Sequence, residues 1–436
     1  MKHLWAVALA ALAGTAAAQT PAEKRIEELE KRVQQLEAEK KTPAGDAANT
    51  PTWKDLVSLG GHLKWYGFLR LDMHYTDSAF DDPRFPTFVR SEDDTTAVAG
   101  VTAAERDDDN FVASARLTRL GFDLDAGKIA TLGDAAATGK FEIDFFSLPS
   151  SESRAVPRLR HAYGKVGWDW LYILFGQTSD VVSPLWPSLN PDNVMWNWGN
   201  TGDRRPQLRI CSEPKLGERL KLTLQTMAGQ QGAIRNSDVD GLGVRDGDDP
   251  GWPELQGRFA IGWQHWVEKK WITLGFSAMY GAEEIDGAGV DGKNHFDTYL
   301  YCVDLDFPVF ESASGFSVSL KGEWWEGINL ADIRGGIGQG INAVSGQEIR
   351  SSGGFVELKV APVKWWAITS GYTRDDPEDH EFSLGMREKN EVWYVMNTFV
   401  FSPFTMSVDF GHWRTEFEEL TSGTANRVTL WFQLSF

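Results

Sequence analysis

The chain has 436 residues, with 62 acidic and 43 basic side chains and a formal net charge of −19 at pH 7. This acidic balance argues against nucleic-acid binding, which requires a basic surface. Cys211 and Cys302 show no disulfide-framework spacing, and the eight histidines form no i, i+4 pairs. Neither an obligatory disulfide nor a metal site or cofactor is therefore expected.

The N-terminal sequence MKHLWAVALAALAGTAAAQT predicts a secretory signal peptide over residues 1–18, cleaved before Gln19 after an A-x-A site. An uncleaved membrane helix would need about 20 apolar residues and a stop-transfer flank. Residues 19–40 then predict a short coiled-coil helix, because Ile26, Leu29, Val33 and Leu36 follow the heptad a/d spacing. Residues 41–61, which begin KTPAGDAANTPT, predict a linker.

From about His62 to the C-terminus the apolar period changes to two, which is typical of β-strands. The last strand, RVTLWFQLSF, has one uniformly apolar face and one mixed face, as a lipid-facing barrel strand does. About sixteen strands are expected. They begin near residues 62, 111, 139, 158, 171, 206, 220, 255, 270, 297, 315, 352, 365, 391, 404 and 428.

Short and long connections alternate between these strands, and tryptophans gather near the strand ends. Both features are typical of outer-membrane barrels, with short periplasmic turns, long extracellular loops and aromatic girdles. The last long loop is expected over Thr415–Arg427. The predicted fold is all-β: a 16-stranded antiparallel transmembrane β-barrel over residues 62–436, preceded by a short α-helical coiled coil. A barrel of this size leaves a lumen too wide for side chains to fill.

The inward-facing residues of such a barrel carry its function, and strand parity predicts which they are. Opposed charges across a lumen orient dipolar solutes, and an excess of one sign sets ion preference. Arg158 and Arg160 in RLRHAYGKV cannot be assigned, because both parities of this strand are polar. The charged residues and one histidine predicted to face inward are Lys64, Arg70, Asp72, His74, Arg119, Lys140, Glu142, Asp144, Arg209, Lys221, Arg258, Asp304, Asp306, Lys321 and Glu323.

The long loop from Ser179 to Arg205 differs from the other loops, because it contains three Pro and three Trp and little charge. A loop that keeps apolar residues in a polar protein is expected to pack inside another structure, here the lumen. It would then narrow the pore, and Arg204 and Arg205 at its base would add positive charge. An extracellular lid or a trimer contact is the alternative.

The chain resembles the trimeric porins of Gram-negative outer membranes, and among them the DcaP-like porins. The resemblance rests on YGFLRLD, RLTRLGF, RLRHAYGKV with FGQT, RRPQLRI and a C-terminal Phe, in that order. It implies a homotrimer that passes small hydrophilic solutes and favours anions such as dicarboxylates. The matching positions are Arg70, Arg119, Arg160, Arg205 and Arg209. With parity and the loop base, the expected pore-lining set is Lys64, Arg70, Arg119, Lys140, Arg160, Arg204, Arg205, Arg209 and Arg258.

The heptad segment also resembles the Arg-h-x-x-h-Glu signature of three-stranded coiled coils, which predicts a periplasmic clasp that holds the trimer together. The clasp residues are Arg25, Ile26, Leu29, Glu30, Arg32, Val33, Leu36 and Glu37. A structural role, in which this helix binds the cell wall or a periplasmic partner, stays open beside the channel. An enzyme is not expected, because no nucleophile motif or metal-binding His motif is present.

The acidic segment Asp238–Asp249 fails the EF-hand calcium pattern, because Gly247 stands where the bidentate Glu should be. It is expected to be a solvated outer-membrane loop. Some of the acidic loops could bind divalent cations that bridge them to lipopolysaccharide. Outer-membrane lipid is the other expected surroundings of the barrel.

Overall fold

The structure is a computed structural model that describes residues 62–93, 109–146, 153–189, 194–234, 246–264, 266–267, 270–285, 292–342, 345–378 and 382–436. The predicted signal peptide, coiled-coil helix and linker, and with them the proposed clasp residues, lie outside these ranges. Most of the acidic segment Asp238–Asp249 lies outside them as well.

The described residues form one large antiparallel sheet and a small hairpin. The strands of the large sheet are β1 (His62–Thr76), β2 (Asn110–Ser114), β3 (Arg119–Ile129), β4 (Ala135–Asp144), β5 (Arg158–Gly167), β6 (Leu171–Ser179), β7 (Arg204–Ser212), β8 (Leu220–Gly229), β9 (Glu254–Trp263), β10 (Ile272–Glu284), β11 (His295–Glu311), β12 (Ser317–Ile328), β15 (Arg350–Val363), β16 (Trp366–Pro377), β17 (Arg387–Phe401), β18 (Phe404–Phe417) and β19 (Leu420–Ser435). The hairpin is β13 (Ile341–Asn342) with β14 (Gln347–Glu348), and three short 3-10 helices are η2 (Ala130–Leu132), η3 (Ala331–Ile333) and η4 (Gly336–Gly338).

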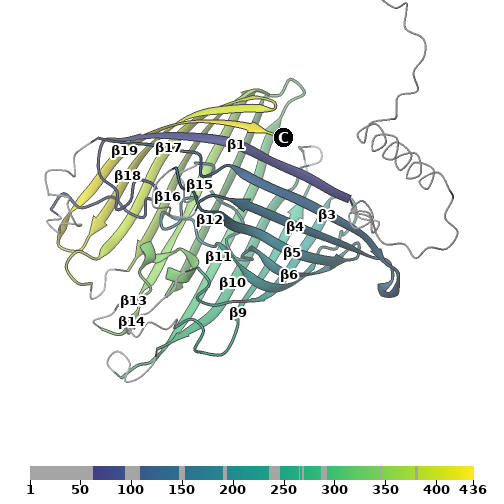
Figure 1. Ribbon diagram of the computed structural model, residues 1–436, viewed down its shortest axis with the longest axis horizontal. Coiled ribbons are helices and arrows are strands. Elements are labelled where there is room, and N and C mark those ends of the chain that lie inside the picture. The colour runs from purple at the N-terminus through teal and green to yellow at the C-terminus, as the bar shows by residue number, and fades with distance from the viewer. Residues whose placement is uncertain are drawn as a thin grey trace, which may run out of the picture. The chain divides into compact units, whose positions relative to one another are not determined.

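The large sheet closes on itself, because β1 pairs with β19 as well as with β2 and β3. Figure 1 shows the first strand, in purple, beside the last, in yellow. Since β2 and β3 pair with successive parts of β1, they act as one interrupted strand. The 17 strands of the sheet therefore make a 16-stranded barrel, as the sequence predicts. Closure leaves no unpaired edge, which a membrane requires.

Short turns occupy one rim of the barrel and long loops the other, with one exception. The predicted long loop Thr415–Arg427 is wrong, because β18 runs to Phe417 and β19 begins at Leu420. The two strands pair as far as Phe417 and Leu420. Their outward residues near this rim are polar, among them Arg414 and Thr424. Apolar alternation disappears above the hydrocarbon region although the strands continue, so the sequence pattern missed them.

The outer surface of the barrel is apolar. On β1, Trp65, Leu69 and Leu71 are exposed and point outward, whereas Asp72 and His74 on the opposite parity are buried. The same alternation holds on β19, where Val428 and Leu434 are exposed. Such a surface suits contact with lipid rather than water. Among the described residues, no helix is long and apolar enough to cross a membrane.

A core lies inside the barrel, made by three long loops and the inward side chains of the strands. We call these the first loop (residues 77–109, described to 93), the third loop (180–203) and the sixth loop (329–349). One apolar cluster joins the first and third loops to β17–β19, and includes Phe80, Trp198 and Trp413. A second joins the third and sixth loops to β10–β12, and includes Trp325 and Ile333. Trp198 and Trp413 pack edge to face with ring centroids 4.7 Å apart.

Candidate functional site: a basic cavity beside the third loop

The third loop leaves β6 and crosses to strands on the far side of the barrel. The backbone N–H groups of Val181 and Val182 both donate to Oε1 of Gln256 on β9, at 2.6 and 3.1 Å. Further along, Asn390 on β17 donates to the carbonyl oxygen of Asn197, at 2.7 Å. Gln256 and Asn390 are buried and lie on the inward parity of their strands. The loop therefore lies inside the barrel.

The tip of this loop is held by two inward carboxylates, and we call this arrangement the tip clamp. Glu323 on β12 accepts from the Ser183 hydroxyl and from the backbone N–H of Leu185, both at 2.5 Å. Glu357 on β15 accepts from the backbone N–H and the hydroxyl of Ser188, both at 2.6 Å. Together these four hydrogen bonds restrain the tip against the wall.

The base of the third loop is held by Arg205 on β7, in what we call the base latch. Its guanidinium is 0% exposed and lies 2.7 Å from Asp180 and 3.0 Å from Asp332 of the sixth loop. It also pairs with Glu254 on β9. One arginine thus ties both loops to the wall, and its buried charge faces three carboxylates.

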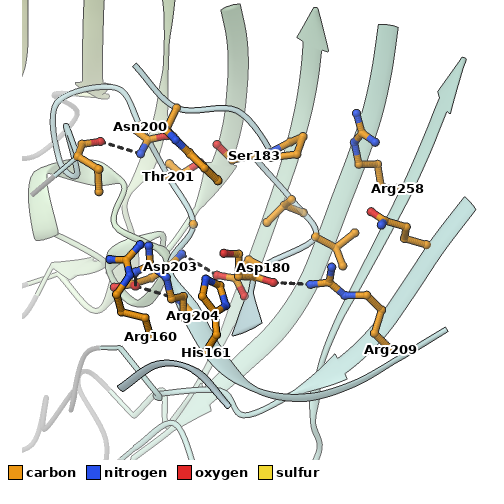
Figure 2. A pocket seen from close by; sticks show the side chains of 18 of the residues that line it. Arg160, His161, Asp180, Ser183, Asn200, Thr201, Asp203, Arg204, Arg209 and Arg258 are labelled. Carbon is orange, nitrogen blue, oxygen red and sulfur yellow. Dashed lines mark hydrogen bonds and ion pairs between the residues drawn. The ribbon is translucent and has the colours of Figure 1, made fainter. Parts of the chain in front are cut away.

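A cavity of about 550 Å³ remains between the third loop and the wall formed by β3–β10. Figure 2 shows Arg160, His161 and Arg204 gathered on one side of it, with Arg209 and Arg258 further along the wall. The charged residues that line it are six basic ones, Arg119, Arg160, Arg204, Arg209, Lys221 and Arg258, and four acidic ones, Glu142, Asp180, Asp203 and Glu213. The third loop contributes Pro184, Trp186 and Trp196 to the facing side.

A β-bulge on β5 decides the direction of the side chains that strand parity could not assign. The pairing of β4 with β5 runs from Glu142 opposite His161 to Ile143 opposite Leu159, so Arg160 has no partner in the ladder. A bulge places two consecutive side chains on the same face. Arg160 and His161 therefore both reach the cavity, and both polar parities of RLRHAYGKV are accounted for.

Five arginines and three carboxylates form two ion-paired groups near the loop side of the cavity, together called the arginine network. Arg158 and Arg160 share Asp144, at 2.7 and 2.9 Å, and Arg160 also bonds Glu142 at 2.6 Å. Arg119 lies 3.5 Å from Glu142. Arg204 and Arg334 share Asp203, at 3.3 and 3.0 Å.

The arginine network has two more positive than negative charges, and its donors are not saturated. The Nε atoms of Arg119 and Arg204 are buried and have no hydrogen-bond partner among the described residues. A buried unsatisfied donor is costly unless a ligand or water completes it. The arginine network therefore adds positive charge to this side of the cavity.

Two further basic residues of the cavity wall have no carboxylate partner in the part of the chain that the structure describes. Arg209 donates to Oε1 of Gln207 at 2.8 Å and to the carbonyl oxygen of Ser179, and it forms no salt bridge in the described part of the chain. Lys221 stands 5.1 Å from the ring of Trp271 and likewise forms no salt bridge with a described residue. Their charges therefore act on the lumen without direct neutralisation.

The other basic residues of the predicted set lie in different surroundings. Arg70 pairs with Asp72 at 2.8 Å and covers the ring of Trp431 at 3.9 Å. Lys140 pairs with Asp123 at 2.8 Å. Lys64 is exposed near the first residue of β1. Of the nine predicted positions, Arg119, Arg160, Arg204, Arg209 and Arg258 line the cavity, with Arg258 held by Asp304 at 2.6 Å.

Sequence reasoning missed part of the site. Arg334 belongs to the sixth loop, where no strand parity applies, and nothing in its neighbourhood marks it. Lys221 has the inward parity, but the expected pore-lining set does not include it. Trp186 could have been noted from the apolar character of the third loop, which the sequence does show.

No protein-family model matches this chain, and no curated protein matches it. Among solved structures, the outer membrane channel DcaP of Acinetobacter baumannii superposes with a TM-score of 0.64 and 19% identity, over 87% of this chain and 98% of that one. The anion-selective porin from Comamonas acidovorans gives 0.54 and 8%, over 86% and 100%. Pseudomonas putida OprB gives 0.53 and 12%, over 88% and 96%.

These identities show the fold, and the fold is that of an outer-membrane porin. The resemblance to DcaP-like porins noted from the sequence is confirmed at that level. A closed barrel of this kind, with an apolar exterior and a polar cavity inside, is the architecture of proteins that span an outer membrane with strands.

Proposed function

We propose that the protein is a homotrimeric porin whose channel favours small anionic solutes. The observation that carries this proposal is the arginine network, in which five guanidinium groups face three carboxylates and leave an excess of two positive charges. Arg209 and Lys221 add unneutralised positive charge along the same wall. A water-filled constriction lined by one sign of charge concentrates ions of the opposite sign.

The third loop acts as the constriction in this proposal. Its tip clamp and base latch hold it across the lumen, so that solutes pass between the loop and the basic wall. The arginine network and Arg209 are two separate cationic sites along this path. A solute with two carboxylates could bind both sites at once, so dicarboxylates are the expected class. The Comamonas acidovorans neighbour is itself described as anion-selective.

The base latch works against this preference, because its three carboxylates outnumber Arg205. Of the three, Asp180 lines the cavity, and its carboxylate is fully buried against Arg205. A buried and paired carboxylate acts less on a passing ion than the exposed charge of an unpaired side chain. The basic wall is therefore expected to dominate the selectivity.

The test is the reversal potential of the purified protein in planar bilayers under a KCl gradient. Chloride should permeate more readily than potassium, and Arg119→Ala combined with Arg204→Ala should reduce that preference. Blocking of the chloride current by succinate tests the expected solute class. A channel that prefers potassium would overturn the proposal.

Trimer formation is proposed from the heptad segment, which lies outside the described residues. Three chains already held together by their barrels provide a high effective concentration, so about two heptads suffice for a clasp. Deleting residues 19–52 should lower the temperature at which the trimer dissociates into monomers in native electrophoresis. If the trimer persists while the cell envelope loosens, the helix is instead a tether to the cell wall or a periplasmic partner.

A further inference from the structure

One tryptophan of the third loop is exposed inside the lumen. Trp196 and Trp198 are 2% and 0% exposed and belong to the packed interior. Trp186 is 51% exposed and lines the cavity. It belongs to neither of the buried apolar clusters. An indole that stays exposed to the lumen adds little hydrophobic free energy to folding. Its position therefore needs an explanation other than packing.

Hydrogen bonds fix the backbone on both sides of Trp186, so the indole is exposed but has a defined position. The N–H of Leu185 donates to Glu323, and the carbonyl oxygen of Trp186 accepts from Nζ of Lys321 at 2.9 Å. Pro184 and Pro187 flank the pair and restrict the backbone further. The tip clamp therefore fixes the place of the ring without covering it.

The opposite side of the same cavity is basic and polar. Arg209, Lys221 and Arg258 line it, together with Thr223 and Gln225. The cavity thus has two unlike sides: cationic donors on the strand wall, and the indole with Pro184 on the loop. A solute that uses both sides needs an anionic group and an apolar body. A small inorganic anion would use the first side alone.

From this arrangement we propose that Trp186 is a specificity-determining residue, which favours organic anions that carry an apolar or planar body over anions that are hydrophilic throughout. The anionic group of such a solute contacts the basic wall, and its body lies against the indole. The proposal rests on the anion preference proposed above and adds to it the chemistry of the rest of the solute. Contact of an apolar body with an aromatic face is a favourable and orienting interaction.

The experiment measures block of single-channel chloride current in the full-length mature protein by three probes. Benzoate has both a charge and an apolar body, acetate has the charge with almost no body, and benzyl alcohol has the body without the charge. Wild-type protein should be blocked most strongly by benzoate. Trp186→Ala should weaken benzoate block by roughly three- to tenfold, the size of one aromatic contact, and leave acetate unchanged.

Two matched variants separate the ring from its surroundings. Trp186→Phe keeps an aromatic face and should retain most of the benzoate block. Trp252→Ala removes another exposed tryptophan, 82% exposed on the loop between β8 and β9 and outside the cavity, and should change nothing. Unchanged chloride preference in Trp186→Ala shows that the basic wall is intact.

The outcomes distinguish this proposal from the one on which it rests. Equal benzoate block in wild type and Trp186→Ala overturns the role of Trp186 and leaves anion preference standing. Loss of block in Trp186→Phe as complete as in Trp186→Ala overturns it too, because contact with an aromatic face then does not account for the block. Benzyl alcohol that blocks as strongly as benzoate, in a channel without chloride preference, overturns the proposed anion function instead.

Discussion

Replacing Arg205 by Met tests the base latch. The guanidinium is fully buried and has Asp180, Glu254 and Asp332 as partners. Removing one partner of a buried ion pair costs about 3–5 kcal/mol, because an uncompensated charge stays behind. Here three carboxylates would stay behind, from β9 and from both loops. At about 1.4 kcal/mol per factor of ten, the population with the third loop released should rise by roughly a hundredfold or more.

Single-channel recording measures this release directly. Wild-type channels should show steady conductance, whereas Arg205→Met should fluctuate between the normal level and larger levels as the loop base moves. The barrel itself should persist, since its strand pairing is unaffected, and heat-modifiable electrophoresis checks this. Adding Asp332→Asn to Arg205→Met removes one of the stranded charges and should reduce the fluctuation. Steady wild-type conductance in Arg205→Met would show that the latch does not hold the loop.

Three further predictions follow from individual contacts. Arg209→Ala should lower the chloride-to-potassium permeability ratio, whereas Arg70→Ala, whose charge is already paired, should not; equal effects would contradict the assignment. Glu323→Gln replaces one of the two accepting oxygens of this tip-clamp residue by an amide nitrogen, which leaves a buried donor without its acceptor at a cost of about 1–3 kcal/mol, and should raise single-channel conductance. Gly199→Ala should lower the yield of folded protein, because φ of Gly199 is 104° and a Cβ there would meet backbone oxygens of β15 and β16. Gly217→Ala is the control, since Gly217 also has a positive φ but lies in open space. Equal yields of folded protein from both variants would refute the argument.

The barrel was predictable because its signal is local. Each outward residue within the membrane contacts lipid, so the apolar alternation on β1 or β19 can be read from a few neighbouring residues. The same reasoning explains the failure over Thr415–Arg427. Above the hydrocarbon region the outward residues Arg414 and Thr424 contact no lipid tails, so β18 and β19 continue without the pattern that would reveal them.

The site was predictable only in part, because pairing between charges depends on distances through space. Parity placed Arg119, Arg209 and Arg258 correctly inside the barrel. It could not predict the direction of Arg160, because the β-bulge interrupts the alternation of β5 at this residue. Only the structure shows which five of the nine expected pore-lining residues share the cavity.

The sequence by itself determined the closed barrel, its number of strands and most inward positions, since these follow from contact with lipid and from the period of a strand. Tertiary structure decided the role of each arginine inside the barrel. Arg204 and Arg205 are neighbours in the chain, yet one joins the arginine network and the other is a buried latch. Their difference comes from Asp203 beside the first and from Asp332, 127 residues away, beside the second. Folding of the sixth loop onto the third brings that carboxylate there, and no local pattern encodes it.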